Sequence, residues 1–227
     1  PKKGFAGKRP FKIFLYGLSG IDKTKFAAYF PKAHFIVDPH EEGIYDLIEF
    51  NQCPEPVGVD TVDSWNNLLE TCYDFDNSEV ETIVFDSVTG FERLCFIDYC
   101  YEHFDNDWSK EGFYSYQQGP KNAAKKSWPD FLDAMDSLNK QGLNIILSGQ
   151  SQVKPYQNPL GPDYDKFIPY LDKETWGYTH RWASAVFFYN QHVVTNKEGT
   201  KHKADVETEE RIICTTESAP YYAKNRW

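Results

Sequence analysis

Short apolar runs separated by polar segments dominate the pattern of this 227-residue chain. Four of the runs show no alternation between apolar and polar positions, which is typical of parallel strands buried on both faces. These runs occupy residues 11–16, 34–37, 82–85 and 143–147. Weaker patterns of the same kind predict strands over 57–60 and 182–190.

Between the runs, apolar residues recur at intervals of three and four positions, which predicts amphipathic helices. We expect these helices over 23–30, 63–73, 88–95 and 128–138. Asp63 is expected to cap the second helix, and Pro129 lies near the start of the last one. Strands that alternate with helices indicate an α/β fold with a mostly parallel central sheet and helices on both faces.

Two long stretches lack this periodicity. Residues 105–120 are polar and aromatic, and residues 151–180 carry several prolines, so both are expected to be long functional loops. Residues 192–215 resemble a C-terminal β-hairpin, and residues 1–10 form a basic N-terminal arm. The length fits a single domain over residues 1–227.

A glycine-containing segment directly follows the first predicted strand. It reads GLSGIDKT and matches the phosphate-binding P-loop G-x-x-x-x-G-K-[ST], except that Asp22 replaces the second glycine. In this motif the backbone amides hold phosphates, the lysine reaches the β- and γ-phosphates, and the hydroxyl binds Mg²⁺. The expected cofactors are therefore ATP and Mg²⁺. The predicted nucleotide ligands are Gly17, Leu18, Ser19, Gly20, Ile21, Asp22, Lys23, Thr24 and Lys25.

Asp22 is the one departure from the P-loop motif. Aspartate tolerates left-handed backbone better than most residues, so the loop can still form. Its carboxylate, however, would stand beside the phosphates and weaken nucleotide affinity by about a few kcal/mol.

Carboxylates follow two other predicted strands. Asp86 ends the run 82–85, as a Walker B carboxylate does, and would bind Mg²⁺ together with Thr24. Glu41 and Glu42 follow the second strand, and a carboxylate at that place can activate the water that attacks the γ-phosphate.

Two further features fit a P-loop ATPase. Gln150 lies at the carboxyl end of the 143–149 strand, where an amide can contact the γ-phosphate and report its presence to the following loop. Lys224 and Arg226 are two residues apart, so on a strand they would face the same way. From a neighbouring subunit, such cations would stabilise the charge that develops in phosphoryl transfer.

Together these motifs resemble those of the RecA-like P-loop ATPases, and most of all compact phage proteins for nucleotide binding or single-strand annealing in recombination. The matching segments span nearly the whole chain. They are Gly17–Thr24, Ile83–Val88, Ile145–Lys154, Asp163–Asp165, Arg181–Val186 and Ala223–Arg226.

The resemblance implies a RecA-type sheet in a homo-oligomer that holds ATP and Mg²⁺ between protomers. It also assigns roles: Glu41 as the catalytic base with Glu42 as the alternative, Gln150 as the sensor, and Lys224 and Arg226 as residues acting on the neighbouring site.

The same resemblance implies that single-stranded DNA is held by the loops near 105–120 and 151–180. A single-strand-binding or other replication protein is a further expected partner. The candidate DNA contacts are Lys154, Tyr156, Tyr164 and Lys166.

Composition limits how DNA could be bound. The net charge of −10 argues against broad electrostatic attraction to phosphates, so binding would depend on local lysine clusters and on aromatic rings. Aromatic residues make up 17% of the chain, enough either to stack on bases or to anchor long loops. Five irregularly spaced cysteines and the lack of an apolar stretch of membrane-spanning length predict a cytoplasmic protein, in the host cell if the chain is phage-encoded.

The expected reaction is DNA-dependent ATP hydrolysis, weakened by Asp22. One alternative is a scaffold that binds or anneals single-stranded DNA without nucleotide, because Asp22 has disabled the site. Another is a small-molecule kinase of the P-loop class, which would need an arginine-rich lid that the sequence does not contain.

Overall fold

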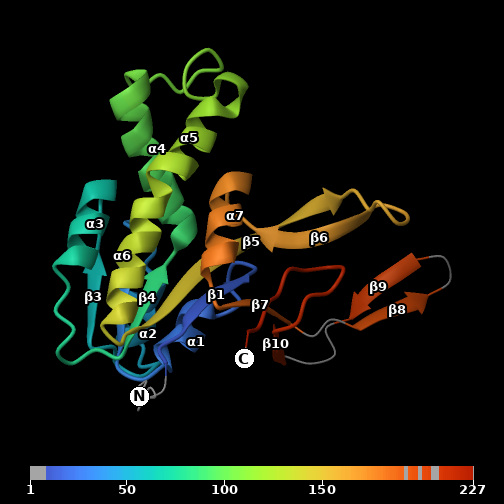
Figure 1. Ribbon diagram of the computed structural model, residues 1–227. Helices are drawn as coiled ribbons and strands as arrows, with labels where there is room; N and C mark the ends of the chain where they lie inside the picture. The colour runs from blue at the N-terminus through green and yellow to red at the C-terminus, as the bar shows by residue number, and fades with distance from the viewer. Residues whose placement is uncertain (1–8, 192–193, 199–200, 206–209, 227) are drawn as a thin grey trace, which may run out of the picture.

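The computed structural model describes residues 9–191, 194–198, 201–205 and 210–226, and for 194–198 and 201–205 it describes the backbone alone. A mostly parallel sheet with the strand order β10-β7-β1-β5-β4-β2-β3 forms the centre (Figure 1). Along this path all neighbours are parallel except β10, which runs antiparallel to β7; an eighth strand, β6 (Tyr164–Pro169), pairs antiparallel with the far part of β5. The strands of the path are β1 (Lys12–Gly17), β2 (Ala33–Val37), β3 (Gly58–Thr61), β4 (Thr82–Asp86), β5 (Asn144–Tyr156), β7 (Ala185–Gln191) and β10 (Arg211–Cys214).

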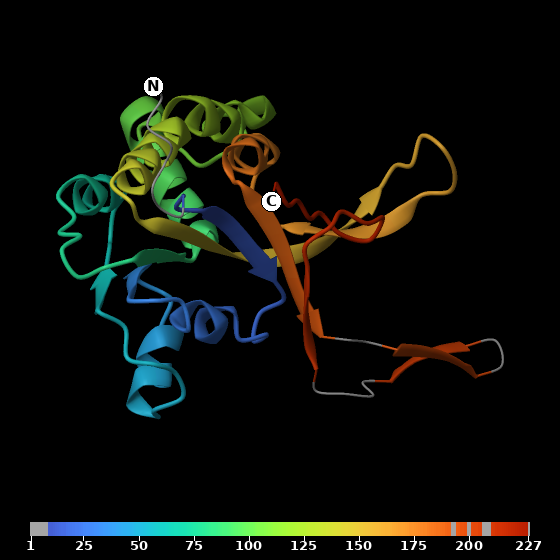
Figure 2. The same ribbon diagram turned by 60° about the horizontal axis from the view of Figure 1, so that its bottom comes forward.

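Helices cover both faces of the sheet, as predicted (Figure 2). Successive residues of a strand face opposite sides. Phe14 and Leu147 therefore pack in a core with α3 to α7, whereas Ile13 and Ile146 pack in a second core with α1 and α2. The helices are α1 (Lys23–Ala28), α2 (Gly43–Glu49), α3 (Trp65–Tyr73), α4 (Val88–Phe104), α5 (Gln118–Lys126), α6 (Trp128–Lys140) and α7 (Lys173–Trp182).

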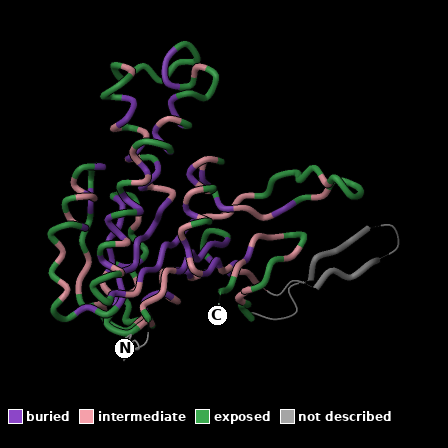
Figure 3. The backbone as a smooth tube through the Cα atoms, in the orientation of Figure 1, coloured by how far each residue is buried: buried purple, intermediate pink, exposed green. Residues whose placement is uncertain are grey.

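Strands β1 and β4 are buried along nearly their whole length, and β5 is buried over residues 145–149, which Figure 3 shows as a purple interior. The prediction of an α/β fold with a mostly parallel sheet is therefore confirmed. None of the helices in the described part of the chain combines the length and the apolar character that a bilayer crossing requires.

The prediction of an irregular loop over 151–180 is wrong for most of its length. Strand β5 continues to Tyr156 and forms an antiparallel hairpin with β6 (Tyr164–Pro169), after which α7 begins at Lys173. Prolines misled the prediction: Pro155 and Pro169 lie in this two-stranded extension, where a missing backbone donor on an outer edge is tolerated. Figure 3 shows the far end of the hairpin as exposed.

The loop predicted over 105–120 is also shorter than expected. A 3₁₀ turn at Ser115–Gln117 leads into α5, which starts at Gln118. Together with the end of α4, this segment forms a protrusion above the sheet (Figure 1). The fully buried ring of Phe113 anchors it against Phe96 and Phe104.

Several element ends differ from the predictions. Ser64, not Asp63, caps α3, because its hydroxyl accepts a hydrogen bond from the Asn67 amide at 3.3 Å. Helix α2 was not predicted at all, and α4 extends to Phe104. Trp182 ends α7 instead of starting a strand.

The C-terminal hairpin consists of β8 (Val194–Glu198) and β9 (Lys201–Asp205), which pair antiparallel as a sheet of their own. The chain then returns to the central sheet as β10. In Figures 1 and 2 this hairpin and the β5–β6 hairpin project from the same side of the body. The predicted basic arm falls mostly on residues 1–8, outside the described residues.

Candidate nucleotide-binding site

Three neighbouring strands bring the predicted site residues together, and Gln150, predicted at the carboxyl end of its strand, lies inside β5, which continues to Tyr156. Strand β5 lies between β1 and β4, and Gly17 at the end of β1 is in register with Gln150 on β5. Asp86 ends β4 one strand further along. Ligands of open α/β sheets bind outside such carboxyl ends.

The P-loop closes around the Lys23 ammonium. Its Nζ donates hydrogen bonds to the Leu18 carbonyl at 2.8 Å, to the Gly17 carbonyl at 3.3 Å and to Gln150 Oε1 at 3.1 Å. Gly17 must lack a side chain, because a Cβ would lie 2.2 Å from the Tyr189 carbonyl oxygen of β7. The loop is thus packed tightly between α1 and the neighbouring strand, with the lysine already directed into it.

Thr24 and Asp86 form the second part of the site. The Thr24 hydroxyl donates a hydrogen bond to Asp86 Oδ2 at 2.6 Å. Hard oxygen donors of this kind suit Mg²⁺, which usually takes one or two protein ligands and completes its shell with phosphate oxygens and water. No group of three or more His, Cys, Asp or Glu side chains in the described residues is arranged to hold a metal.

Glu41 and Glu42, which the sequence alone could not separate, lie in different environments. Glu41 is half-buried and lines a cavity of about 410 Å³ together with Lys23, Thr24 and Gln150. Glu42 is exposed at the start of α2 and does not line this cavity. Of the two carboxylates, Glu41 is therefore the one placed at the P-loop.

Burial sets the protonation of the site. It raises the pKa of Glu41, and the nearby Asp86 carboxylate raises it further. Burial also raises the pKa of Asp86 and lowers that of Lys23, although Asp86 and Glu41 pull the lysine pKa back up. Two carboxylates thus lie near the Lys23 ammonium, and buried Asp38 lies near both of them, an excess of negative charge that a bound cation would relieve.

Asp22 adopts the left-handed backbone that the motif normally reserves for glycine, with φ 67° and ψ 36°. The prediction that the loop can form with aspartate is confirmed. Its carboxylate, expected to stand uncompensated beside the phosphates, instead pairs with Arg211 of β10 at 2.6 Å. Sequence reasoning missed this pair because Arg211 comes from the far end of the chain.

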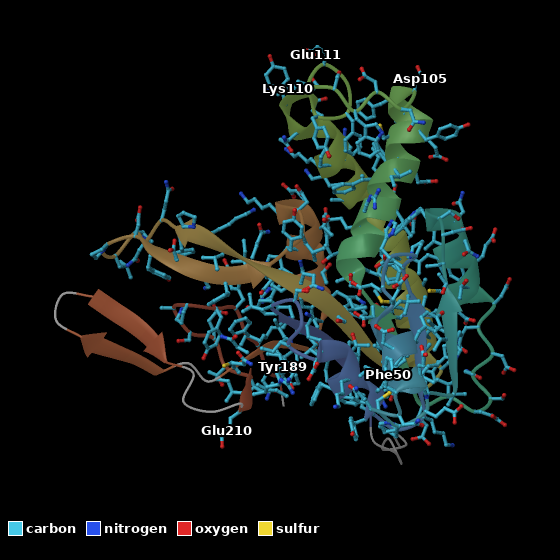
Figure 4. All side chains as sticks on the ribbon, turned by 180° about the vertical axis from the view of Figure 1, so that it is seen from behind. Phe50, Asp105, Lys110, Glu111, Tyr189 and Glu210 are labelled. Atoms are coloured by element: carbon cyan, nitrogen blue, oxygen red, sulfur yellow. The ribbon has the colours of Figure 1, made fainter. Side chains whose placement is uncertain are left out.

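The far wall of the nucleotide cavity was also missed. Helix α2 and the residues after it contribute Leu47, Phe50 and Gln52. Phe50 is 65% exposed, and Figure 4 labels it in the lower part of the body. An exposed ring and an amide facing a phosphate loop are groups that can contact a nucleobase.

A second, larger cavity of about 730 Å³ lies beside α4, and we refer to it as the α4 groove. Its walls come from α4, the protrusion, the β5–β6 hairpin and the turn before α7. Exposed cationic and aromatic side chains line it. They are Arg93, Trp108, Tyr114, Lys154 and Tyr170.

A smaller cavity of about 390 Å³ joins the two sites. It shares Glu41 and Gln150 with the nucleotide cavity, and Thr89 and Arg93 with the α4 groove. The backbone amide of Gln150 donates a hydrogen bond to Thr89 Oγ1 at 3.4 Å, which links the two sites through the protein.

The four candidate DNA contacts lie opposite one another on the β5–β6 hairpin, as the pairs Lys154–Lys166 and Tyr156–Tyr164, but they are not equally accessible. Lys154 is exposed and lines the α4 groove, whereas Tyr156 and Tyr164 pack on each other with ring centroids 5.2 Å apart. Lys166 is buried, paired with Glu217 at 3.0 Å and placed 3.7 Å from the Tyr222 ring centroid. A buried and paired ammonium is not presented to a phosphate, so we withdraw Lys166 from the candidates.

Lys224 and Arg226 lie away from the nucleotide cavity of their own chain. Lys224 forms an isolated bridge with Val186 near the start of β7, so the strand predicted here is wrong. Both side chains still point the same way, because they donate to the carbonyls of His180 and Arg181 at the end of α7. Burial and the nearby Arg226 lower the pKa of Lys224 to about 8.

Comparison with known proteins identifies a family. A family model described as an AAA domain matches residues 9–227. No curated protein matches the sequence.

Proposed function

This chain belongs to the AAA domain family of P-loop NTPases, and we propose that it is a RecA-like ATPase that acts on single-stranded DNA. The family indicates a nucleotide-binding ATPase. The RecA-like type, the DNA substrate, a role in recombination and an origin in a phage rest on the sequence resemblance and on the arguments that follow.

One observation carries the nucleotide part of the proposal. Four separate segments of the chain contribute to the same cavity of about 410 Å³ at the carboxyl edge of the sheet, with Lys23 and Thr24 from one and Glu41, Asp86 and Gln150 from the others. These are the residue types that phosphoryl transfer needs, in the order that the motifs place them. Phe50 and Gln52 close the cavity at its other end, where the base would lie.

Each residue has a distinct task in this proposal. The Lys23 ammonium exchanges its carbonyl partners for phosphate oxygens, and Gln150, which it contacts, is thereby placed to sense the γ-phosphate. Thr24 and Asp86 hold the metal, which when bound neutralises charge on the phosphates. The raised pKa of Glu41 suits a general base that takes a proton from the attacking water.

The cavity has no arginine among its described lining residues, and its cations are Lys23 and Lys25. Phosphoryl transfer is strongly accelerated when a further cation approaches the γ-phosphate. Lys224 and Arg226 lie together outside this cavity, where they donate to carbonyls at the end of α7, and we assign them to the site of a neighbouring copy and hence to a homo-oligomer.

The α4 groove is our candidate for single-stranded DNA. It combines Arg93 and Lys154 with the exposed rings of Trp108, Tyr114 and Tyr170. Cations that follow a backbone and rings on which bases stack are the usual elements of sequence-independent single-strand binding. A partnership with a single-strand-binding or other replication protein stays a prediction.

Calorimetry with ATP and Mg²⁺ tests the nucleotide part. We expect binding by the natural protein and a loss of about 100-fold in Lys23→Ala, since charge-assisted hydrogen bonds to the phosphates disappear. Lys140→Ala removes an exposed lysine at the end of α6 and is the control. Equal affinities in Lys23→Ala and the natural protein would exclude the P-loop as the binding site.

Anisotropy of a labelled oligo-dT, measured with and without ATP, tests the DNA part. Stronger DNA binding with ATP supports a nucleotide-controlled DNA protein. Equal affinity for oligo-dT with and without ATP would instead favour the scaffold that acts without nucleotide. Absence of oligo-dT binding would overturn the DNA assignment.

A further inference from the structure

The residue that replaces the P-loop glycine has a partner from the end of the chain. The Asp22 carboxylate and the Arg211 guanidinium are 2.6 Å apart, and both side chains are little more than a third exposed. Arg211 is the first residue of β10 and lies opposite Gln191, the last residue of β7. The pair therefore joins the phosphate loop to the edge of the sheet from which the β8–β9 hairpin departs.

The position of the pair is fixed by packing on β7. The Tyr189 carbonyl of β7 faces Gly17 at the start of the loop. Arg211 and Asp22 both act electrostatically on the phenol of the same tyrosine, with opposite signs. Figure 4 shows Tyr189 at this edge of the sheet, near Glu210, which directly precedes β10.

Without a partner, Asp22 would oppose nucleotide binding. It lines the nucleotide cavity, and a carboxylate close to a triphosphate repels it. Arginine is well suited to the opposite effect, because its planar guanidinium stays charged and fixes a carboxylate in one orientation. Lys25, the other cation next to the loop, forms no ion pair with Asp22 among the described contacts.

We propose that Arg211 is a positioning residue of the nucleotide site, which turns the Asp22 carboxylate toward β10 and cancels its charge, so that a P-loop without its second glycine accepts ATP. This inference rests on the proposed function, namely that the loop binds ATP with Mg²⁺. Asp22 and Arg211 then form one functional unit: the aspartate is harmful without the arginine, whereas the arginine is dispensable without the aspartate.

A double-mutant cycle tests the proposal. ATP–Mg²⁺ affinity is measured by calorimetry for the natural protein, Arg211→Ala, Asp22→Gly and the double variant. Arg211→Ala should weaken ATP binding about tenfold, a modest figure because solvent screens a pair that is partly exposed. In the Asp22→Gly background the same arginine replacement should cost nothing, since no carboxylate remains to be held.

Two further measurements separate this role from simple support of β10. Arg211→Lys keeps the charge and should restore most of the affinity. High salt should shrink the defect of Arg211→Ala, because it screens the exposed carboxylate from the phosphates. If Arg211→Ala merely destabilised β10, it would weaken ATP binding equally in the natural and the Asp22→Gly backgrounds. Arg211→Lys would then not restore the affinity for ATP.

The possible failures differ from one another. If the natural protein binds ATP and Arg211→Ala binds equally well, the role of Arg211 is overturned and the proposed function stands. If Asp22→Gly alone binds ATP, Arg211 does not compensate the aspartate, and the inference is overturned. If neither the natural protein nor Asp22→Gly binds ATP, the inference and the nucleotide-binding proposal are both overturned.

Discussion

The nucleotide cavity and the α4 groove are joined by the smaller cavity between them, but their polar groups are held in different ways. In the cavity, Lys23 and Thr24 begin α1, Asp86 ends β4, and all three are bonded to other groups of the site. In the groove, Lys154 and Tyr170 are exposed and extend from a hairpin and a turn. A fixed constellation suits chemistry on one ligand, whereas exposed rings and cations suit a polymer whose bases differ.

The comparison predicts that single changes act sharply in the cavity and gradually in the groove. The largest effect is expected at Glu41. Glu41→Gln removes the proposed base, so ATP turnover should fall about 10²- to 10⁴-fold while ATP binding persists. Steady-state ATPase assays with oligo-dT, together with calorimetry, measure the two quantities.

Glu42→Gln is the matched control, since it makes the same chemical change at the exposed neighbour. Its turnover should equal that of the natural protein. A larger loss in Glu42→Gln than in Glu41→Gln would show that the wrong carboxylate has been assigned.

The contrast also explains what the sequence could predict. Lys23, Asp86 and Gln150 each follow an apolar run, and parallel strands end at the same edge of a sheet, so their meeting could be predicted. The choice between Glu41 and Glu42 could not, because only the turn before α2 decides which carboxylate enters the cavity.

Contacts between distant segments could not be predicted from the sequence. The Asp22–Arg211 pair forms because β10 joins the sheet beside β7, and no local sequence pattern predicts that strand pairing. In the groove, the aromatic residues divided between both expected roles: Phe113 is buried and anchors the protrusion, while Tyr170 stays exposed. Composition identified these rings as a group, but only packing separates them.

The second prediction concerns the groove itself. Tyr170→Ala combined with Lys154→Ala should weaken oligo-dT binding about tenfold, since one stacking surface and one phosphate contact are lost. ATP binding without DNA should not change. Tyr73→Ala with Lys140→Ala, on α3 and α6, removes the same two residue types outside the groove and is the control for fluorescence anisotropy. Equal loss in both double variants would remove the groove as the DNA site.

One carboxyl group of the groove is buried and has a raised pKa, like the carboxyl groups of the cavity. Glu92 lies buried in its floor, where burial raises its pKa to about 7. The folded protein therefore binds more protons than the unfolded chain between about pH 4.5 and about pH 7, and this carboxyl's contribution to stability is lost as the pH rises through that window. Glu92→Gln keeps an oxygen for the Asp172 amide, which now donates to Glu92 Oε1 at 2.8 Å, and removes the titration.

We expect Glu92→Gln to raise the free energy of unfolding by about 1–3 kcal/mol at about pH 8, with little change at about pH 4. Urea unfolding at the two pH values measures this difference. Glu102→Gln makes the same change on the exposed side of the same helix and is the matched control. A Glu92→Gln variant that is less stable at the higher pH would mean that the charged carboxylate stabilises the fold.

The smallest effect is expected where the two sites meet. The Gln150 side chain contacts Lys23, and its backbone amide contacts Thr89. Gln150 therefore belongs to the nucleotide cavity and borders the groove. Gln150→Ala should leave oligo-dT binding without nucleotide unchanged, because the side chain faces the P-loop. The mutual strengthening of ATP and DNA binding should, however, fall about fivefold, the lower end of typical coupling between sites.

Because coupling is reciprocal, ATP titrations with DNA and DNA titrations with ATP must lose the same factor. A variant that loses affinity for ATP alone, with the coupling intact, would make Gln150 a simple phosphate ligand, and the link between the two regions would then have to run through α4.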